Sequence, residues 1–159
     1  MAWVSPHVFG VGEVLTASEM NNIGTDLNWL YSYLTASTSG NAGGVQTTSS
    51  TSYTSLTGGP SVTLSTATTA LVIVTATISN ASQSSNYVGY AVSSPTSNAA
   101  SDTKALTVGT SYPYGIYSSS IVIYDNTLTS GVNTFTLQYK TNNGTASFSN
   151  RSITVIPLN

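Results

Sequence analysis

The stretch that decides the fold is Thr134–Leu158, with the sequence TFTLQYKTNNGTASFSNRSITVIPL. In its first seven residues polar and apolar side chains alternate, which is the pattern of a strand with one buried face. The pair Asn143-Gly144 follows and favours a two-residue type I′ hairpin turn. In that register Tyr139 lies opposite Phe148 as an aromatic cross-strand pair. The stretch therefore predicts two antiparallel strands joined by a tight turn.

Strand-like segments continue upstream of this stretch, separated by clusters of Gly, Pro, Asn and Ser. They cover residues 62–64, 70–78, 87–92 and 116–124, and the C-terminal stretch adds 134–140, 146–148 and 153–158. Many short strands at this spacing, with no second helical pattern, are typical of an antiparallel sandwich or barrel. We predict an all-β antiparallel fold over residues 53–159, preceded by one short N-terminal helix.

Several of these strands are apolar on both faces, namely at residues 71–74, 121–123 and 153–158. An antiparallel sheet normally turns one face to the core and the other to water. A second apolar face therefore needs a cover, and a neighbouring subunit is the simplest one. The second apolar face therefore predicts an interface between subunits, with these candidate residues: Val72, Val74, Ile121, Ile123 and Ile156.

A helix is predicted over residues 16–34, after an irregular segment 1–15. Thr16 and Glu19 have the spacing of a capping box, and Leu15 and Met20 that of a hydrophobic staple. The apolar residues then form a narrow seam of the coiled-coil type: Met20, Ile23, Leu27, Leu30 and Leu34. Such a short helix is marginal alone. Two interpretations stay open, self-association or docking to a larger assembly, and docking on the chain's own domain.

The N-terminal segment 1–34 is predicted to attach the protein to its assembly. Trp3, Phe9 and Trp29 add large apolar surface to the helix seam. Residues 35–52, TASTSGNAGGVQTTSSTS, are rich in Gly, Ser, Thr and Asn and predict a flexible linker between the helix and the sandwich.

Charged residues make up only 5% of the 159 residues, against about 25% in a typical domain. Ser and Thr, about a third of the chain, take their place. The net charge is −2 and the only cations are Lys104, Lys140 and Arg151, which argues against nucleic acid as a partner. Such an uncharged, hydrogen-bonding surface lacks the electrostatic repulsion that normally keeps copies of a protein from associating. It favours an assembly protein over an enzyme.

Other compositional features narrow the classes further. There is no cysteine, so disulfides and thiolate metal sites are excluded. The longest apolar run falls far short of the roughly 20 residues that cross a bilayer, and the N-terminus does not have the pattern of a secretory signal. We therefore predict no membrane insertion and synthesis in the cytoplasm.

The sequence offers no catalytic residues, no cofactor site and no metal site. His7 lies beside Pro6 in the irregular segment, so no base is placed near a nucleophile. Asp102 and Asp125 are the only carboxylates of the β region, and a lone carboxylate gives a Ca²⁺ site weak support. Arg151 lies in an apolar segment, where an arginine is usually paired or caps carbonyls, so a structural role is predicted.

Tyrosines in or near predicted loops are the candidates for ligand contact: Tyr87, Tyr112, Tyr114 and Tyr117. Their rings could stack on a host cell-surface glycan or on a partner protein. Core packing explains some of them equally well.

Two segments carry a resemblance to known structural proteins. GPSVTLSTATTALVIVTATISN (59–80) and NTFTLQYKTNNGTASFSNRSITVIPLN (133–159) resemble C-terminal modules of tailed-phage structural proteins. Those modules look like the trimeric jelly roll of the complement C1q and tumour necrosis factor class. The resemblance covers about residues 58–159 and implies an antiparallel jelly-roll sandwich that assembles as a homotrimer.

The leader WVSPHVFGVGEVLTASEMNNIGTDLNWLY (3–31) is similar to one found in phage minor tail and fibre proteins. The residues that match it are Trp3, Gly12, Glu13, Leu15, Thr16, Ala17, Asn21, Asp26, Leu27 and Asn28. The two resemblances imply a non-enzymatic virion protein that contacts other virion proteins of the capsid or tail. A short head fibre or capsid decoration is the first expectation, and a tail-associated receptor-binding protein is the alternative.

Overall fold

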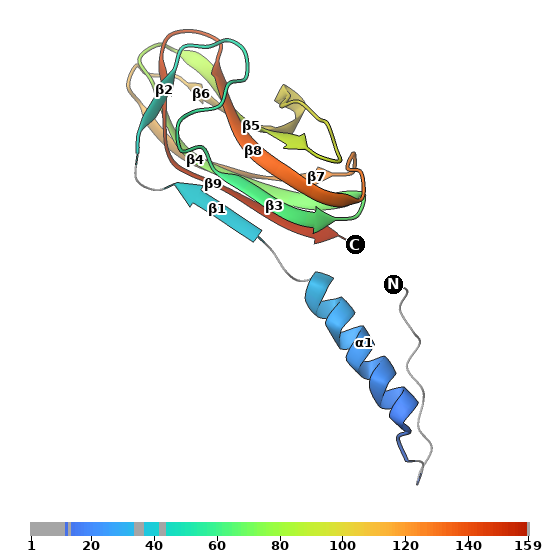
Figure 1. Cartoon of the computed structure of the whole chain (residues 1–159). Coiled ribbons are helices and arrows are strands. Elements are labelled where there is room, and N and C mark those ends of the chain that lie inside the picture. Colours follow the sequence, from blue (N-terminus) through green and yellow to red (C-terminus); the bar gives the residue numbers. More distant parts are fainter. Residues whose placement is uncertain (1–11, 13, 34–36, 42–43, 159) are drawn as a thin grey trace. The chain divides into compact units, whose positions relative to one another are not determined.

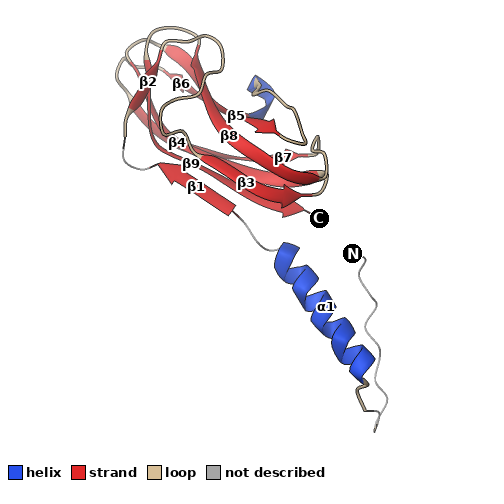
Figure 2. Ribbon diagram, viewed as in Figure 1, coloured by secondary structure: helices blue, strands red, loops and turns tan. Residues whose placement is uncertain are grey.

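The computed structural model describes residues 12, 14–33, 37–41 and 44–158. The chain divides into two compact units, one up to Thr35 and one from Ala36 onward. The first contains helix α1 (Ala17–Tyr33), and the second is built from strands (Figures 1 and 2). The predicted fold class, an all-β sandwich with one short N-terminal helix, is confirmed.

The strands form two antiparallel sheets. Sheet A contains β1 (Ser37–Asn41), β2 (Gln46–Thr48), β4 (Thr69–Asn80), β7 (Ile116–Asp125) and β9 (Ala146–Leu158). Sheet B contains β3 (Ser61–Thr66), β5 (Ser84–Ser93), β6 (Ala105–Thr110) and β8 (Gly131–Thr141), and the short helix η1 (Asp102–Lys104) precedes β6. Figure 1 shows the two sheets facing each other.

The strand order is that of a jelly roll. In sheet A, β9 lies between β4 and the pair β1 and β2, and β7 follows β4; sheet B has the order β3-β8-β5-β6. From β2 to β9 the chain alternates between the sheets, except that β5 and β6 are adjacent hairpin partners. Such alternation produces the nested Greek keys of a jelly roll.

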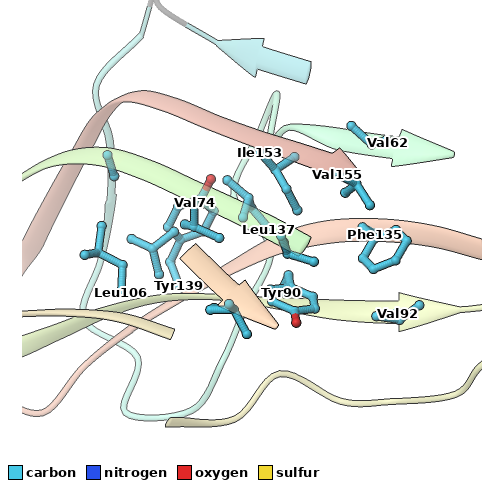
Figure 3. Packing of buried hydrophobic residues seen from close by; sticks show 14 of the residues in the cluster. Val62, Val74, Tyr90, Val92, Leu106, Phe135, Leu137, Tyr139, Ile153 and Val155 are labelled. Carbon is cyan, nitrogen blue, oxygen red and sulfur yellow. The ribbon is translucent and has the colours of Figure 1, made fainter. Parts of the chain in front are cut away.

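The core lies between the sheets and follows the period of two that strands impose. On β4 the even-numbered residues from Ala70 to Ile78 are at most 1% exposed. On β8 the predicted inward residues Phe135, Leu137 and Tyr139 are fully buried, so that part of the sequence prediction is confirmed. Figure 3 shows side chains from both sheets interleaving, with Val74 and Ile153 on one side and Phe135 and Leu137 on the other.

The predicted hairpin between the last two strands is wrong. β8 and β9 belong to different sheets, and residues 142–145 carry the chain from one sheet to the other. Gly144 has φ +69°, whereas Asn143 is not among the residues of positive φ, so the turn is not of type I′. Tyr139 and Phe148 do meet, with ring centroids 5.0 Å apart, but they do so across the core.

The predicted flexible linker at 35–52 is also wrong over its described part. β1 and β2 lie inside this range and pair with successive parts of β9, Ser37 opposite Val155 and Gln46 opposite Phe148. Ser and Thr side chains suit an edge strand as well as they suit a linker. Composition alone therefore could not separate the two structures.

Two ends of the sandwich can be distinguished. β1 begins opposite Val155 and Thr69 pairs with Leu158, which defines the proximal end, where the chain enters the sandwich. The distal end holds the connections 81–83, 111–115 and 142–145. There the buried Asn80 Nδ2 donates to Asn86 Oδ1 (2.7 Å), to Thr141 Oγ1 (3.0 Å) and to the Asn143 carbonyl (3.0 Å). This network fixes the distal connections to the core.

Candidate functional site

The outer face of sheet A is divided into two halves along its strands. Toward the proximal end, Leu71 lies between Tyr124 and Ile156, and Ile73 lies between Val122 and Thr154. Leu158 continues this surface opposite Thr69. We call the apolar side chains of this half the apolar patch: Leu71, Ile73, Val122, Tyr124, Ile156 and Leu158. Val122 is 58% and Tyr124 59% exposed, and the other four are half-buried.

The other half of this face carries hydroxyl groups. Thr75 lies between Ser120 and Ser152, and the next row places Thr77 beside Ser118. The Thr77 and Ser118 hydroxyls are hydrogen-bonded at 2.8 Å. Neither half contains a charged side chain on the described strands β4, β7 and β9, apart from those that point inward.

This arrangement corrects most of the predicted trimer interface. Val72 and Val74 are fully buried and Ile123 is 9% exposed, so all three belong to the chain's own core. Ile121 also points inward and packs against that core. Of the five candidates only Ile156 lies on the outer face. The physical reason is the alternation of side chains: in a strand that is apolar on both faces, adjacent residues point to opposite faces, and only one of these faces is the core.

The outward-facing apolar residues of β4 could be recognised from the alternation in its sequence. The odd positions of β4 run Thr69, Leu71, Ile73, Thr75, Thr77 and Ser79, whereas the even positions stay apolar up to Ile78. The uninterrupted apolar series is the core face. The opposite face therefore holds the surplus apolar residues, and Leu71 and Ile73 could have been chosen from the sequence.

A second exposed apolar surface lies at the distal end. Tyr112 and Tyr114, in the connection between β6 and β7, are 73% and 76% exposed, and Ile116 at the start of β7 is 75% exposed. Hydrogen bonds hold the connection in place. The Tyr114 N–H donates to the Asn80 carbonyl (2.8 Å), and Gln83 Nε2 donates to the Ser111 carbonyl (2.8 Å).

Tyr114 adopts a left-handed conformation, with φ +62°. For a residue other than glycine this region costs about 1–3 kcal/mol and persists only where the surroundings enforce it. Here the Gly115 N–H also donates to the Tyr112 carbonyl at 3.1 Å, which closes the turn around Tyr114. The connection therefore presents two aromatic rings from a fixed backbone.

The other two tyrosine candidates have different surroundings. Tyr117 points inward and packs against the core, so it is wrong as a ligand residue. Tyr87 lies half-buried on the outer face of sheet B, opposite Lys140 on β8. The Lys140 ammonium lies 4.4 Å from the Tyr87 ring centroid and 5.2 Å from that of Tyr53. It also forms an ion pair with Asp102 at 2.7 Å.

The second ion pair of the sandwich joins Lys104 and Asp125, at 2.7 Å. Asp125 is fully buried at the end of β7. Tyr90 Oη donates to the second oxygen of Asp125 at 2.8 Å. The Thr127 N–H and hydroxyl complete the set at 3.0 and 2.7 Å. Every carboxylate oxygen thus has a donor, as burial of a charge requires.

These contacts shift proton affinities in opposite directions. Burial by itself would raise the pKa of Asp125, but the hydrogen bonds from Lys104, Thr127 and Tyr90 lower it overall. Burial, with the charge of Asp125 next to it, raises the pKa of Tyr90. The hydrogen bond from Lys140 lowers the pKa of Asp102. Both aspartates of the sandwich are therefore held as anions in ion pairs, and neither is poised as a general acid near neutral pH.

Arg151 is the remaining charge of the sandwich and is buried in β9, 1% exposed. It lies next to the bulge where the pairing of β4 and β9 shifts between Thr75 and Thr77. Its guanidinium carbon is 5.5 Å from the Tyr139 ring centroid, and its Nη2 donates to the Thr57 carbonyl at 3.5 Å. Burial raises the pKa of Tyr139 to about 12 although the charge of Arg151 lowers it. These contacts agree with the predicted structural role.

The helical unit confirms the predicted capping box. The Thr16 N–H and hydroxyl both donate to the Glu19 carboxylate at 2.7 Å, and the Glu19 N–H donates to Thr16 Oγ1 at 3.3 Å. On the helix Met20, Ile23 and Leu27 are 58%, 44% and 60% exposed. The remaining attachment candidates lie outside the residues whose side chains are described: Trp3, Phe9, Trp29, Leu30 and Leu34.

Within the described part of the chain, three or more His, Asp or Glu side chains nowhere come together as they would around a metal ion. None of the described helices combines the length and the hydropathy needed to cross a membrane. Comparison with protein-family models and with curated proteins gives no match to this chain.

Proposed function

We propose that this chain is a non-enzymatic virion structural protein of a tailed phage, a homotrimeric short fibre or capsid decoration attached through its N-terminal segment. The observation that carries the proposal is the apolar patch. A soluble sheet face normally turns polar side chains to water, yet here six large apolar side chains are adjacent on three neighbouring strands.

The composition of the outer face favours a second copy of the same chain as its cover. In a rotationally symmetric assembly the same residues of each subunit meet around the axis, so a like charge on that face would be repelled by its own copies. The described outer face of β4, β7 and β9 has no charge, and hydroxyl groups continue it toward the distal end. Trimers rather than dimers follow from the resemblance of residues 58–159 to the C1q and tumour necrosis factor class.

The N-terminal unit supports attachment. Its capped helix exposes Met20, Ile23 and Leu27 along one seam, and an apolar seam of this kind is ordered by contact with other helices or with a docking site. The sandwich begins directly after this unit, since β1 starts at Ser37. A knob joined so closely to its attachment segment is expected close to the particle surface, which favours a decoration over a long fibre.

The ionisable groups of the sandwich support a role without catalysis. Asp102 and Asp125 are both held in ion pairs, and Arg151 is buried. Hydrolysis of a glycan would need two carboxylates set about 5–10 Å apart around a substrate, one of them with a raised pKa. The lowered pKa values of both aspartates are the opposite of that requirement.

The second candidate function is a tail-associated receptor-binding protein. The distal tyrosines favour it, because Tyr112 and Tyr114 are held in a fixed loop at the end of the sandwich opposite the chain's entry. Both candidates share the same trimer and differ in where the particle carries it.

Cryo-electron microscopy of the intact particle, with the chain labelled by a tag, tests the proposal. Many copies on the capsid are expected for the decoration, and a few trimers at the tail for the alternative. Absence of the chain from purified particles would refute both, as would turnover of a polysaccharide or peptidoglycan that disappears in Asp102→Ala or Asp125→Ala.

A further inference from the structure

We infer that the distal connection 111–115 is a binding platform for a neutral saccharide of the host cell surface, formed by Tyr112 and Tyr114 with Ile116 beside them. The inference rests on the proposed function for its setting and deepens it by naming the partner. It is carried by the exposure of the two rings, their fixed backbone, the absence of charge from the distal connections and the position of the platform.

The exposure is unusual for side chains of this size. Tyr112, Tyr114 and Ile116 each leave about three quarters of their surface in water. Several large apolar side chains exposed at neighbouring positions of a soluble domain indicate a contact site. Single exposed residues would need no explanation, but three within five positions do.

The backbone is prepared for binding. Tyr114 is held at φ +62° although it is not a glycine, and its N–H is fixed to Asn80 of the buried distal network. Ser111 is fixed to Gln83. Strained residues that a well-bonded framework enforces concentrate at functional sites. A platform fixed in advance also loses little conformational entropy when a ligand binds.

The surroundings select the chemistry of the ligand. The three distal connections read Ala81-Ser82-Gln83, Ser111-Tyr-Pro-Tyr-Gly115 and Asn142-Asn-Gly-Thr145, and none contains a charged residue. Aromatic rings surrounded by amides and hydroxyls match a neutral sugar, because the C–H face of a pyranose stacks on a ring while its hydroxyls form hydrogen bonds. A charged sugar would lose its hydration without gaining a counter-charge.

The size of the platform favours a sugar over a protein partner. A stable protein interface uses about 20–30 residues on each side, whereas the exposed apolar surface here comes from three side chains. Within the sandwich, the platform lies at the opposite end from the start of β1.

The test measures binding of the purified full chain to a microarray of neutral and acidic oligosaccharides from bacterial surface polysaccharides, followed by saturation-transfer NMR on the neutral sugars that bind. Tyr112→Ala and Tyr114→Gly are expected to weaken binding by about tenfold or more, as the loss of an aromatic anchor does. Tyr114→Phe keeps the ring and is expected to retain binding within about threefold, because stacking uses the face of the ring and not the hydroxyl.

Tyr114→Gly also separates a binding role from a structural one. Glycine adopts φ +62° without strain, so this variant is expected to keep or raise the melting temperature while it loses the saccharide. A fall in both stability and binding would show that the ring serves the fold, and would overturn the inference.

Two further outcomes of the array would overturn it: no binding to any saccharide, or binding to acidic sugars only. Attachment of the chain to host cells gives a third: if treating the cells with protease abolishes attachment, the receptor is a protein and the inference is overturned. The proposed function is tested separately by measuring attachment of the same preparations to virus particles. A chain that decorates particles but binds no neutral saccharide refutes the platform alone. A chain that binds neutral saccharides through both tyrosines but never attaches to particles supports the platform and refutes the virion role.

Discussion

Val122→Asp tests the assembly most directly. Val122 lies on the outer face of β7 and is 58% exposed in the single chain, so an aspartate there remains hydrated in a monomer. Strand propensity changes by no more than about 1 kcal/mol. If three copies meet through the apolar patch, the same aspartate becomes buried in each of them. The variant is therefore expected to remain folded and to lose its partners.

The magnitude follows from the exposed fraction. Complete burial of a valine side chain contributes about 1.5–3 kcal/mol, so covering the 58% that is exposed contributes about 1–2 kcal/mol per subunit and about 3–5 kcal/mol per trimer. This loss alone weakens the association constant of the trimer by about 100-fold or more. Each buried carboxylate without a partner adds a penalty of several kcal/mol.

The assay is light scattering after size-exclusion chromatography, with circular dichroism as the measure of folding. Wild type is expected at the mass of a trimer and Val122→Asp at the single-chain mass of 16.4 kDa, with unchanged β-sheet spectra. Ser118→Asp is the matched control, because Ser118 lies on the same face of the same strand in the hydroxyl half. It is expected to weaken the trimer less. A wild-type chain that is monomeric at micromolar concentration, or a Val122→Asp variant that stays trimeric, would refute the reasoning.

Three more predictions concern the sandwich and its attachment. Asn80→Ala removes the donor to three buried or partly buried acceptors, so urea denaturation should show a free energy of unfolding lower by about 2–4 kcal/mol. The control is Asn142→Ala, at an exposed position, and its free energy of unfolding should stay within about 0.5 kcal/mol of wild type. Because the pKa of Asp125 is lowered in the folded state, its ionisation stabilises the fold above the ordinary pKa of about 4, and this stability is lost as pH falls through the lower folded value. The urea midpoint should therefore decrease between about pH 5 and pH 2, and Asp125→Asn, less stable at neutral pH, should show a smaller acid decrease. Deletion of residues 1–34 should leave a folded sandwich that no longer binds particles, and so should the double variant Leu27→Asp with Leu30→Asp. Deletion of residues 1–52 should also lower the melting temperature, because it removes β1 and β2 from the edge of β9. Particle binding by the chain without residues 1–34 would place attachment in the sandwich instead.

The sequence alone determined the class of the fold. Alternation in residues 134–140 identified the buried face of β8, because a strand repeats every two residues whatever surrounds it. The Thr16 and Glu19 capping box located the helix start, since its hydrogen bonds join residues only three positions apart. Such local patterns can be recognised in the sequence without knowing how the rest of the chain folds. The scarcity of charge is likewise a property of the composition, and it predicts assembly rather than catalysis.

Only the tertiary structure decided which segments meet. The last two strands looked like a hairpin, yet they belong to opposite sheets, because a short connection can turn within a sheet or cross the core. Residues 35–52 looked like a linker, yet β1 and β2 lie within this range and pair with β9 as edge strands. Val74 and Ile73 are adjacent and equally apolar, but pairing with β7 and β9 between two facing sheets buries the first and leaves the second on the outer face. The unbroken apolar series on the even positions of β4 indicates which of its faces is buried. It does not indicate which strands lie beside β4 or cover that face, because those neighbours come from the fold.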